Sequence, residues 1–123
     1  MTIEQKELLI KDLSGRLPYG VKASTKIGGN IKISFMGEDT IIGEDGDSYD
    51  ISFITPYLYP LSSMTEEQKE EHKDLLDNQY LGLDANGNVF TLQDFYCKYH
   101  LDYRGFIPNG LAKDATGMNI YKK

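Results

Sequence analysis

The stretch that most constrains the fold is residues 54–65, Ile-Thr-Pro-Tyr-Leu-Tyr-Pro-Leu-Ser-Ser-Met-Thr. Pro56 and Pro60 each fix φ and remove one backbone donor, and the residue before a proline is biased away from the helical region. The stretch is therefore expected to run extended, with enough apolar surface to lie against a core. We interpret it as a joint inside one domain. The predicted parts are residues 1–55, the joint 56–65, and residues 66–123.

The residues before the joint follow the patterns of one helix and several short strands. Residues 2–16 predict an amphipathic helix, since Thr2 and Gln5 have the spacing of a capping box. The apolar residues that recur on one face of this helix are Ile3, Leu9, Ile10, Leu13 and Leu17. Apolar and polar residues then alternate, most clearly at Ile31, Ile33 and Phe35, with the period of a strand. The expected strands are residues 21–25, 31–36, 40–43 and 49–53.

Four strands at such close spacing indicate an antiparallel meander. The meander can form an open sheet or a small curled, SH3-like barrel. A sheet of this size does not bury its apolar face alone, so the first helix is expected to cover that face. The predicted fold class is therefore α+β, with a helical part after the sheet.

The residues after the joint predict two more helices and a small hairpin. Thr65 and Gln68 repeat the capping-box spacing before a mostly polar helix over residues 66–76. A hairpin is expected from residues 80–83 and 89–90. Thr91 is expected to cap a last helix, with a tail from Lys113 that is loosely held. The apolar face predicted for that helix consists of Leu92, Phe95, Tyr96, Tyr99 and Tyr103.

Charge and cysteine content limit the classes of partner and compartment. The chain has 123 residues and a net charge of −6, which opposes binding to a nucleic-acid backbone or to an anionic membrane surface. No stretch approaches the ~20 apolar residues of a membrane span. Cys97 is the only cysteine, so an intramolecular disulfide is impossible. Nucleic-acid binding by the predicted strands has only Lys22, Lys26 and Lys32 in its favour. We expect a cytoplasmic protein that binds neither nucleic acid nor membrane.

Two acidic patterns are candidate metal sites. Residues 38–50 carry several carboxylates, but their spacing does not match a calcium loop, and Asp45-Gly46 is typical of a hairpin turn. Asp84, Asn86 and Asn88 resemble the start of a calcium loop, yet Val89 stands where that loop requires glycine. We interpret both patterns as polar turns, and expect no metal and no cofactor.

The enzyme hypothesis depends on one pair of residues. Cys97 and His100 are three positions apart on a predicted helix, with Asp102 nearby, and a thiolate beside an imidazolium is reactive. Patterns of serine hydrolases and zinc proteases are absent from the sequence. A small enzyme that uses this pair is the alternative function. A non-catalytic protein is the leading expectation, and no catalytic residue is assigned.

Tyrosine is over-represented in this chain, which has nine tyrosines and no tryptophan. Tyrosine offers a large contact area at little cost in rotamer entropy, so it suits interfaces. The same rings can also pack the joint against the last helix inside one molecule, and the sequence leaves both readings open. The candidate binding surface consists of Tyr57, Tyr59, Tyr99, Tyr103 and Arg104.

Three segments carry a resemblance to a known family: residues 8–22 (LLIKDLSGRLPYGVK), 56–65 (PYLYPLSSMT) and 101–112 (LDYRGFIPNGLA). With these the chain resembles a family of small proteins without an established activity, found in gut Bacteroidetes genomes and in their phages and mobile elements. That family has arginine where this chain has Tyr59. The resemblance implies an accessory role rather than metabolic catalysis. The predicted function is thus a non-catalytic protein-interaction or accessory module whose partner is another protein or a second copy of itself.

Overall fold

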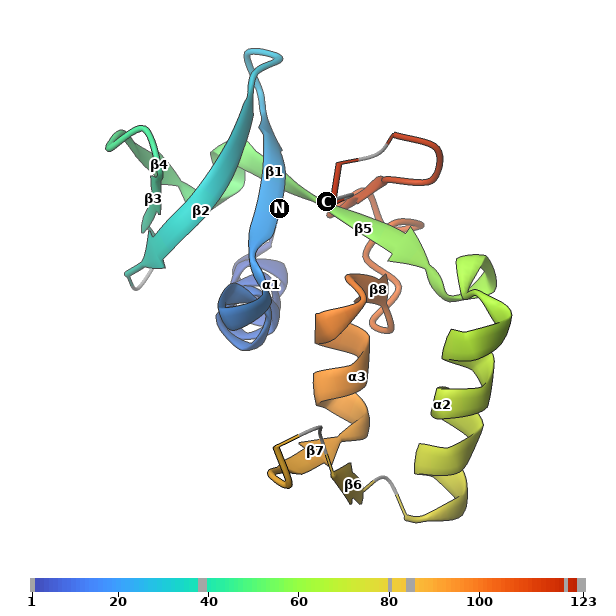
Figure 1. Ribbon diagram of the computed structural model, residues 1–123. Helices are drawn as coiled ribbons and strands as arrows, with labels where there is room; N and C mark the ends of the chain where they lie inside the picture. The colour runs from blue at the N-terminus through green and yellow to red at the C-terminus, as the bar shows by residue number, and fades with distance from the viewer. Residues whose placement is uncertain (1, 38–39, 80, 84–85, 119, 122–123) are drawn as a thin grey trace.

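The structure is a computed structural model that describes residues 2–37, 40–79, 81–83, 86–118 and 120–121 (Figure 1). One helix and a sheet come first, and two helices with a small hairpin follow. The helices are α1 (Ile3–Arg16), α2 (Glu66–Asp77) and α3 (Leu92–Lys98). The strands of the main sheet are β1 (Val21–Thr25), β2 (Asn30–Met36), β3 (Thr40–Gly43), β4 (Ser48–Asp50), β5 (Ile54–Pro60), β8 (Leu101–Asp102) and β9 (Lys113–Asp114). The hairpin is β6 (Leu81–Leu83) with β7 (Val89–Thr91), so the predicted α+β class is confirmed.

Helix α1 begins at the predicted capping box. The Thr2 hydroxyl accepts from the backbone of Gln5 at 3.0 Å, and the Gln5 side chain accepts from the backbone of Thr2 at 2.9 Å. Leu9 and Leu13 are fully buried against the sheet. The predicted apolar face is wrong at Ile3, which is 75% exposed because it lies in the first turn beyond the sheet core.

The predicted antiparallel meander is confirmed. Strands β4, β3, β2 and β1 pair in that order, with a register shift in β2 between Ile33 and Phe35. A one-turn 3₁₀ helix (Ile51–Phe53) replaces the end of the predicted fourth strand. Strand β5 then pairs with β1, so β1 lies between β2 and β5.

The proline-containing joint is extended, as predicted, but it is also a strand of the sheet. Its first half pairs antiparallel with β1, where Ala23 lies opposite Pro56. Its second half pairs in parallel with β8 and β9. Tyr59 donates its backbone N–H to the His100 carbonyl at 2.8 Å, and Ala115 donates to the Leu58 carbonyl at the same distance. Pro56 and Pro60 lack N–H groups, but Leu58 and Tyr59 between them still form backbone hydrogen bonds with the C-terminal part.

Two predictions for the C-terminal part are wrong. Helix α3 ends at Lys98 because His100 takes a left-handed φ of 57°, so Tyr103 does not lie on that helix. The described residues after Lys113 are not loosely held, since β9 pairs with β5 and Ala115 is completely buried. The turn before them is stabilised by Asp102, whose carboxylate accepts from the backbone N–H groups of Phe106 and Ile107 at 2.9 Å.

A buried ionic network joins the first helix to the C-terminal part. Arg16 donates through Nε to Asp12 Oδ2 at 2.7 Å and through Nη2 to the Leu101 carbonyl at 2.6 Å. Arg104 donates through Nε to Asp12 Oδ1 at 2.9 Å. Asp12 and Arg16 are both completely enclosed, so this network ties α1 to β8 and the residues after it.

Candidate functional site

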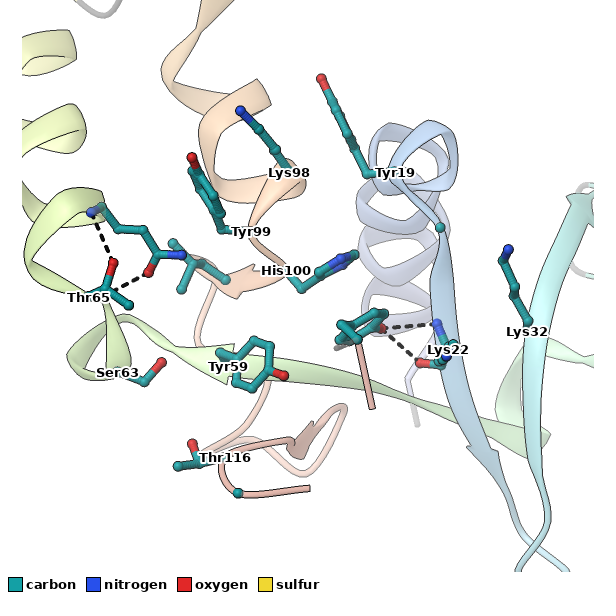
Figure 2. Close-up of a pocket in the computed structure, with 15 residues that line it drawn as sticks. Tyr19, Lys22, Lys32, Tyr59, Ser63, Thr65, Lys98, Tyr99, His100 and Thr116 are labelled. Atoms are coloured by element: carbon teal, nitrogen blue, oxygen red, sulfur yellow. Dashed lines mark hydrogen bonds between the residues drawn. The ribbon is translucent and has the colours of Figure 1, made fainter. Parts of the chain in front are cut away.

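A groove of about 940 Å³ opens on the described surface (Figure 2). It opens between the sheet and the two C-terminal helices. Its walls come from the start of β1, from β2 and β5, from the first turn of α2, from the end of α3 and from the C-terminal segment. The lining residues that bear on function are Tyr19, Lys22, Lys32, Tyr59, Lys98, Tyr99, His100 and Tyr121.

Tyrosine rings form the apolar part of the groove. Tyr59 extends from β5, and Tyr99 extends from the end of α3 (Figure 2). The Tyr99 hydroxyl donates to Glu71 Oε2 at 2.8 Å, and burial together with this bond raises the pKa of Tyr99 to about 12. Tyr59 meets the ring of Tyr121 edge-on at a centroid distance of 6.1 Å. These contacts hold the rings in fixed positions with part of each face in the groove.

Tyr121 connects the C-terminal segment to two strands. Its hydroxyl donates to the Tyr57 carbonyl at 2.8 Å and accepts from the Lys22 N–H at 3.0 Å. Burial raises the pKa of Tyr121 to about 12. The hydroxyl lies where the ladder between β1 and β5 ends, since Ala23 and Pro56 are the last pair of the register on this side. Tyr121 therefore closes one end of the groove.

His100 lies flat against Tyr121, with ring centroids 3.6 Å apart and planes inclined by 7°. Burial, together with the positive charges of Arg16 and Lys22, lowers the pKa of His100 to about 4. The imidazole is therefore neutral near pH 7, and it provides a flat surface rather than a charge.

The charged side chains of the groove are all basic. Lys22 lies on β1, Lys32 on β2, and Lys98 in the last turn of α3. The Lys22 ammonium donates to the Ile120 carbonyl at 2.8 Å, and Lys98 Nζ lies 5.1 Å from the ring centroid of Tyr99. No aspartate or glutamate lines the groove in the part of the chain that the structure describes. This is unusual for a protein with a net charge of −6.

The five predicted binding residues lie in three different places. Tyr59 and Tyr99 line the groove. Tyr57 is 4% exposed, and its hydroxyl donates to Asn30 Oδ1 at 2.7 Å. Tyr103 stacks on Tyr96 at 4.8 Å, and the Arg104 guanidinium lies over the Tyr103 ring while it binds Asp12. The structure thus brings Tyr59 and Tyr99 together, and separates them from the Tyr103–Arg104 pair.

Sequence reasoning missed three residues of the groove. Tyr121 lies in the segment that was expected to be loose, and His100 was considered only as a partner of Cys97. Lys98 belongs to no sequence motif, although the sequence does predict the helix that contains it. Lys22 and Lys32 were noted only as weak support for nucleic-acid binding.

The structure gives Cys97 properties opposite to those of a nucleophile. Its side chain is 2% exposed, and burial raises the pKa of the thiol. The His100 ring is stacked on Tyr121, and Asp102 accepts two backbone N–H groups. The Cys97–His100–Asp102 alternative therefore has no support in the geometry.

The carboxylates of the predicted polar turns take part in local hydrogen bonds. Asp45 accepts from the Asp47 N–H at 3.0 Å and from the Tyr49 hydroxyl at 2.9 Å. Within residues 2–37, 40–79, 81–83, 86–118 and 120–121, no group of three or more His, Cys, Asp or Glu side chains is placed to hold a metal ion. Glu38, Asp39 and Asp84, which belonged to the patterns considered, lie outside the described residues.

No described helix has both the length and the apolar character needed to cross a membrane. Comparison of the chain with protein-family models, with curated proteins and with solved structures finds no match.

Proposed function

We propose that this protein is a non-catalytic interaction module that binds an extended segment of another protein in the groove. The observation that carries the proposal is the groove itself, whose walls combine tyrosine rings with lysines and come from elements far apart in the sequence. Aromatic-lined grooves are a recurring way to bind extended peptides, and tyrosine is enriched in interfaces.

The arrangement favours binding over catalysis. Cys97 is enclosed with a raised pKa, and His100 is stacked with a pKa of about 4. Neither group is suited to acid–base or nucleophilic work at neutral pH. We therefore assign the groove a recognition role without a chemical step.

The sequence supports a proposal for the biological setting. The resemblance to small proteins of gut Bacteroidetes and their phages and mobile elements supports an accessory role in such a genome. The single cysteine supports a cytoplasmic location. The acidic net charge supports a partner other than nucleic acid or membrane.

A second surface supports self-association. Leu81, Leu83 and Val89 lie on the same face of the β6–β7 hairpin, since Leu83 pairs with Val89, and their exposed fractions are 53%, 72% and 67%. The opposite face of the hairpin packs on Leu75, which would lie 3.1 Å from a Cβ at Gly82. Clustered exposed aliphatic side chains indicate an interaction site. We propose this hairpin face as the contact for a second copy of the chain.

The groove proposal is tested by selecting peptides from a displayed random library on the immobilised protein. Thr116 lines the groove and is exposed, so Thr116→Trp should fill the groove and abolish binding of the selected peptides. Ser14→Trp adds the same ring at an exposed position of α1 outside the groove and should leave binding unchanged. Thermal melts of both variants check the fold. A selection without enriched peptides, or peptides that bind Thr116→Trp as well as the parent, would contradict the proposal.

A further inference from the structure

The strands β1 and β2 place two lysines directly opposite each other. The register pairs Lys22 with Lys32, so both side chains leave the same face of the sheet, and both line the groove. Like charges directly opposite on neighbouring strands destabilise a sheet. Glu44 relieves this only in part, since its carboxylate lies 3.4 Å from Lys32 Nζ and both side chains are about half exposed. The pair of like charges is therefore locally unfavourable, and an anion bound in the groove would offset this repulsion.

Lys98 adds a third positive charge from another element. Its ammonium lies over the rings of Phe90 and Tyr99, at 5.7 Å and 5.1 Å from their centroids. Among the described residues, neither Lys98 nor Lys22 has a carboxylate within ion-pair distance. The groove thus concentrates positive potential on a protein whose net charge is −6, which attracts anions to this place and repels them elsewhere.

We infer that the groove recognises an acidic peptide segment, whose carboxylates contact Lys22, Lys32 and Lys98 while its ring or aliphatic side chains lie on Tyr59 and Tyr99. This inference depends on the proposed function and specifies its ligand. An extended chain directs successive side chains to opposite sides. A segment in which acidic and apolar residues alternate can therefore direct its carboxylates to the lysines and its apolar side chains to the tyrosine rings.

The charge distribution favours a peptide over a nucleic acid. A nucleic acid presents a continuous row of phosphates and gains affinity from many basic contacts. The groove offers three lysines, and the exposed acidic residues Glu66 and Glu67 begin α2 beside the groove residue Thr65. A short segment with a few carboxylates fits beside this acidic flank, whereas a long polyanion that extends past the groove meets repulsion there.

The test uses three fluorescent peptides with the same tyrosines, in which the alternate positions are glutamate, glutamine or lysine. The glutamate peptide should bind best, and salt should weaken its binding. Lys32→Gln and Lys98→Gln should each weaken it about two- to fivefold, since exposed ion pairs are individually weak. Lys69→Gln removes an exposed lysine of α2 that lies outside the groove and should leave binding unchanged.

The outcomes separate this inference from the proposed function. If selected peptides bind the groove but contain no excess of acidic residues, and the two lysine variants bind them normally, the acidic-ligand inference is wrong and the groove proposal survives. If no peptide binds in a manner blocked by Thr116→Trp, both are wrong. If a single-stranded oligonucleotide binds more tightly than the glutamate peptide, with the same dependence on Lys32 and Lys98, the ligand is a nucleic acid and the peptide assignment is overturned.

Discussion

The two hydrophobic clusters among the described residues differ in composition and in how completely their side chains are buried. The cluster under the sheet is mostly aliphatic, with Leu9, Leu13, Ile41 and Ile51 fully enclosed. The cluster between α2 and α3 is smaller and mostly aromatic, built on Leu75, Phe95 and Leu101. Its outer rings are only partly buried, and they contact polar groups, as in the bonds of Tyr96 to His72 and of Tyr99 to Glu71.

This difference indicates that the aliphatic cluster mainly stabilises the fold, whereas the aromatic cluster mainly provides a surface for binding. A closed aliphatic core contributes stability in proportion to the apolar area that it removes from water. A half-open aromatic cluster contributes less, but it presents ring faces and hydroxyls whose positions are fixed by neighbours. The groove lies against the aromatic cluster, because Tyr59 and Tyr99 belong to both.

The largest effect on stability is expected at Phe95, the completely buried ring of the aromatic cluster. Phe95→Ala should lower the free energy of unfolding by about 3–5 kcal/mol, and Leu13→Ala in the sheet core by about 2–5 kcal/mol. Urea titrations followed by far-UV and near-UV circular dichroism should give one shared transition for each variant. A separate early transition of the tyrosine signal in Phe95→Ala would show that the two clusters unfold independently.

The next effect concerns the ionic network that joins the two regions. Asp12→Asn leaves two arginines without their shared carboxylate, one of them fully enclosed, and should cost about 3 kcal/mol of stability. Lys69→Gln removes an exposed ion pair and should leave the urea midpoint unchanged. Equal midpoints for the parent and Asp12→Asn would contradict the structural role of the network.

A smaller effect is expected from pH at the groove. The pKa of His100 falls from 6.5 to about 4 on folding, so the unfolded chain binds a proton over this window that the folded chain does not. The contribution of His100 to the free energy of unfolding is therefore fully present above pH 6.5. It should fall by about 2 kcal/mol as the pH drops to 4, after allowance for the partial exposure of the ring.

The matched control for this titration is His100→Asn. Asparagine tolerates the left-handed φ of 57° at this position but does not titrate. The variant should lose less stability than the parent between pH 6.5 and pH 4, since the carboxylates titrate in both. Parallel stability curves would show that His100 is not the responsible group.

The smallest change in stability is expected at the hairpin face. Leu83 is 72% exposed, so Leu83→Thr should change the free energy of unfolding by less than about 0.5 kcal/mol. If the face binds a second copy, sedimentation at rising protein concentration should show weaker association for the variant. Identical sedimentation of variant and parent would remove the face as a self-association site.

Local features were predictable from the sequence. Thr2, Thr65 and Thr91 each cap a helix through a hydroxyl that reaches the third residue on, and that spacing is visible without tertiary structure. Strands β1 to β4 follow from alternation and from turn residues between them. These elements depend on interactions within a few residues of one another.

Features that depend on distant contacts were not predictable. Strands β8 and β9 have two residues each, too few for any period, and they exist because β5 offers an edge. Asp12 and Arg16 have the spacing of an ion pair within one helix, but their complete enclosure depends on the tertiary contacts of α1, which include the bond from Arg16 to the distant Leu101 carbonyl. The groove combines residues from across the chain, so its charge could not be read from any single segment.

Strands β8 and β9 pair with β5 but are synthesised after it, so this part of the sheet forms last. Residues 57–60 are synthesised well before residues 101–102 and 113–114, which alone pair with their outer edge in the described structure. A nascent chain that has already formed the meander carries this edge open to other polypeptides throughout the synthesis of both later helices. Pro56 precedes the open segment and Pro60 is its last residue. Because proline offers no N–H, these two residues limit the backbone hydrogen bonds that another strand can form with the segment during that interval.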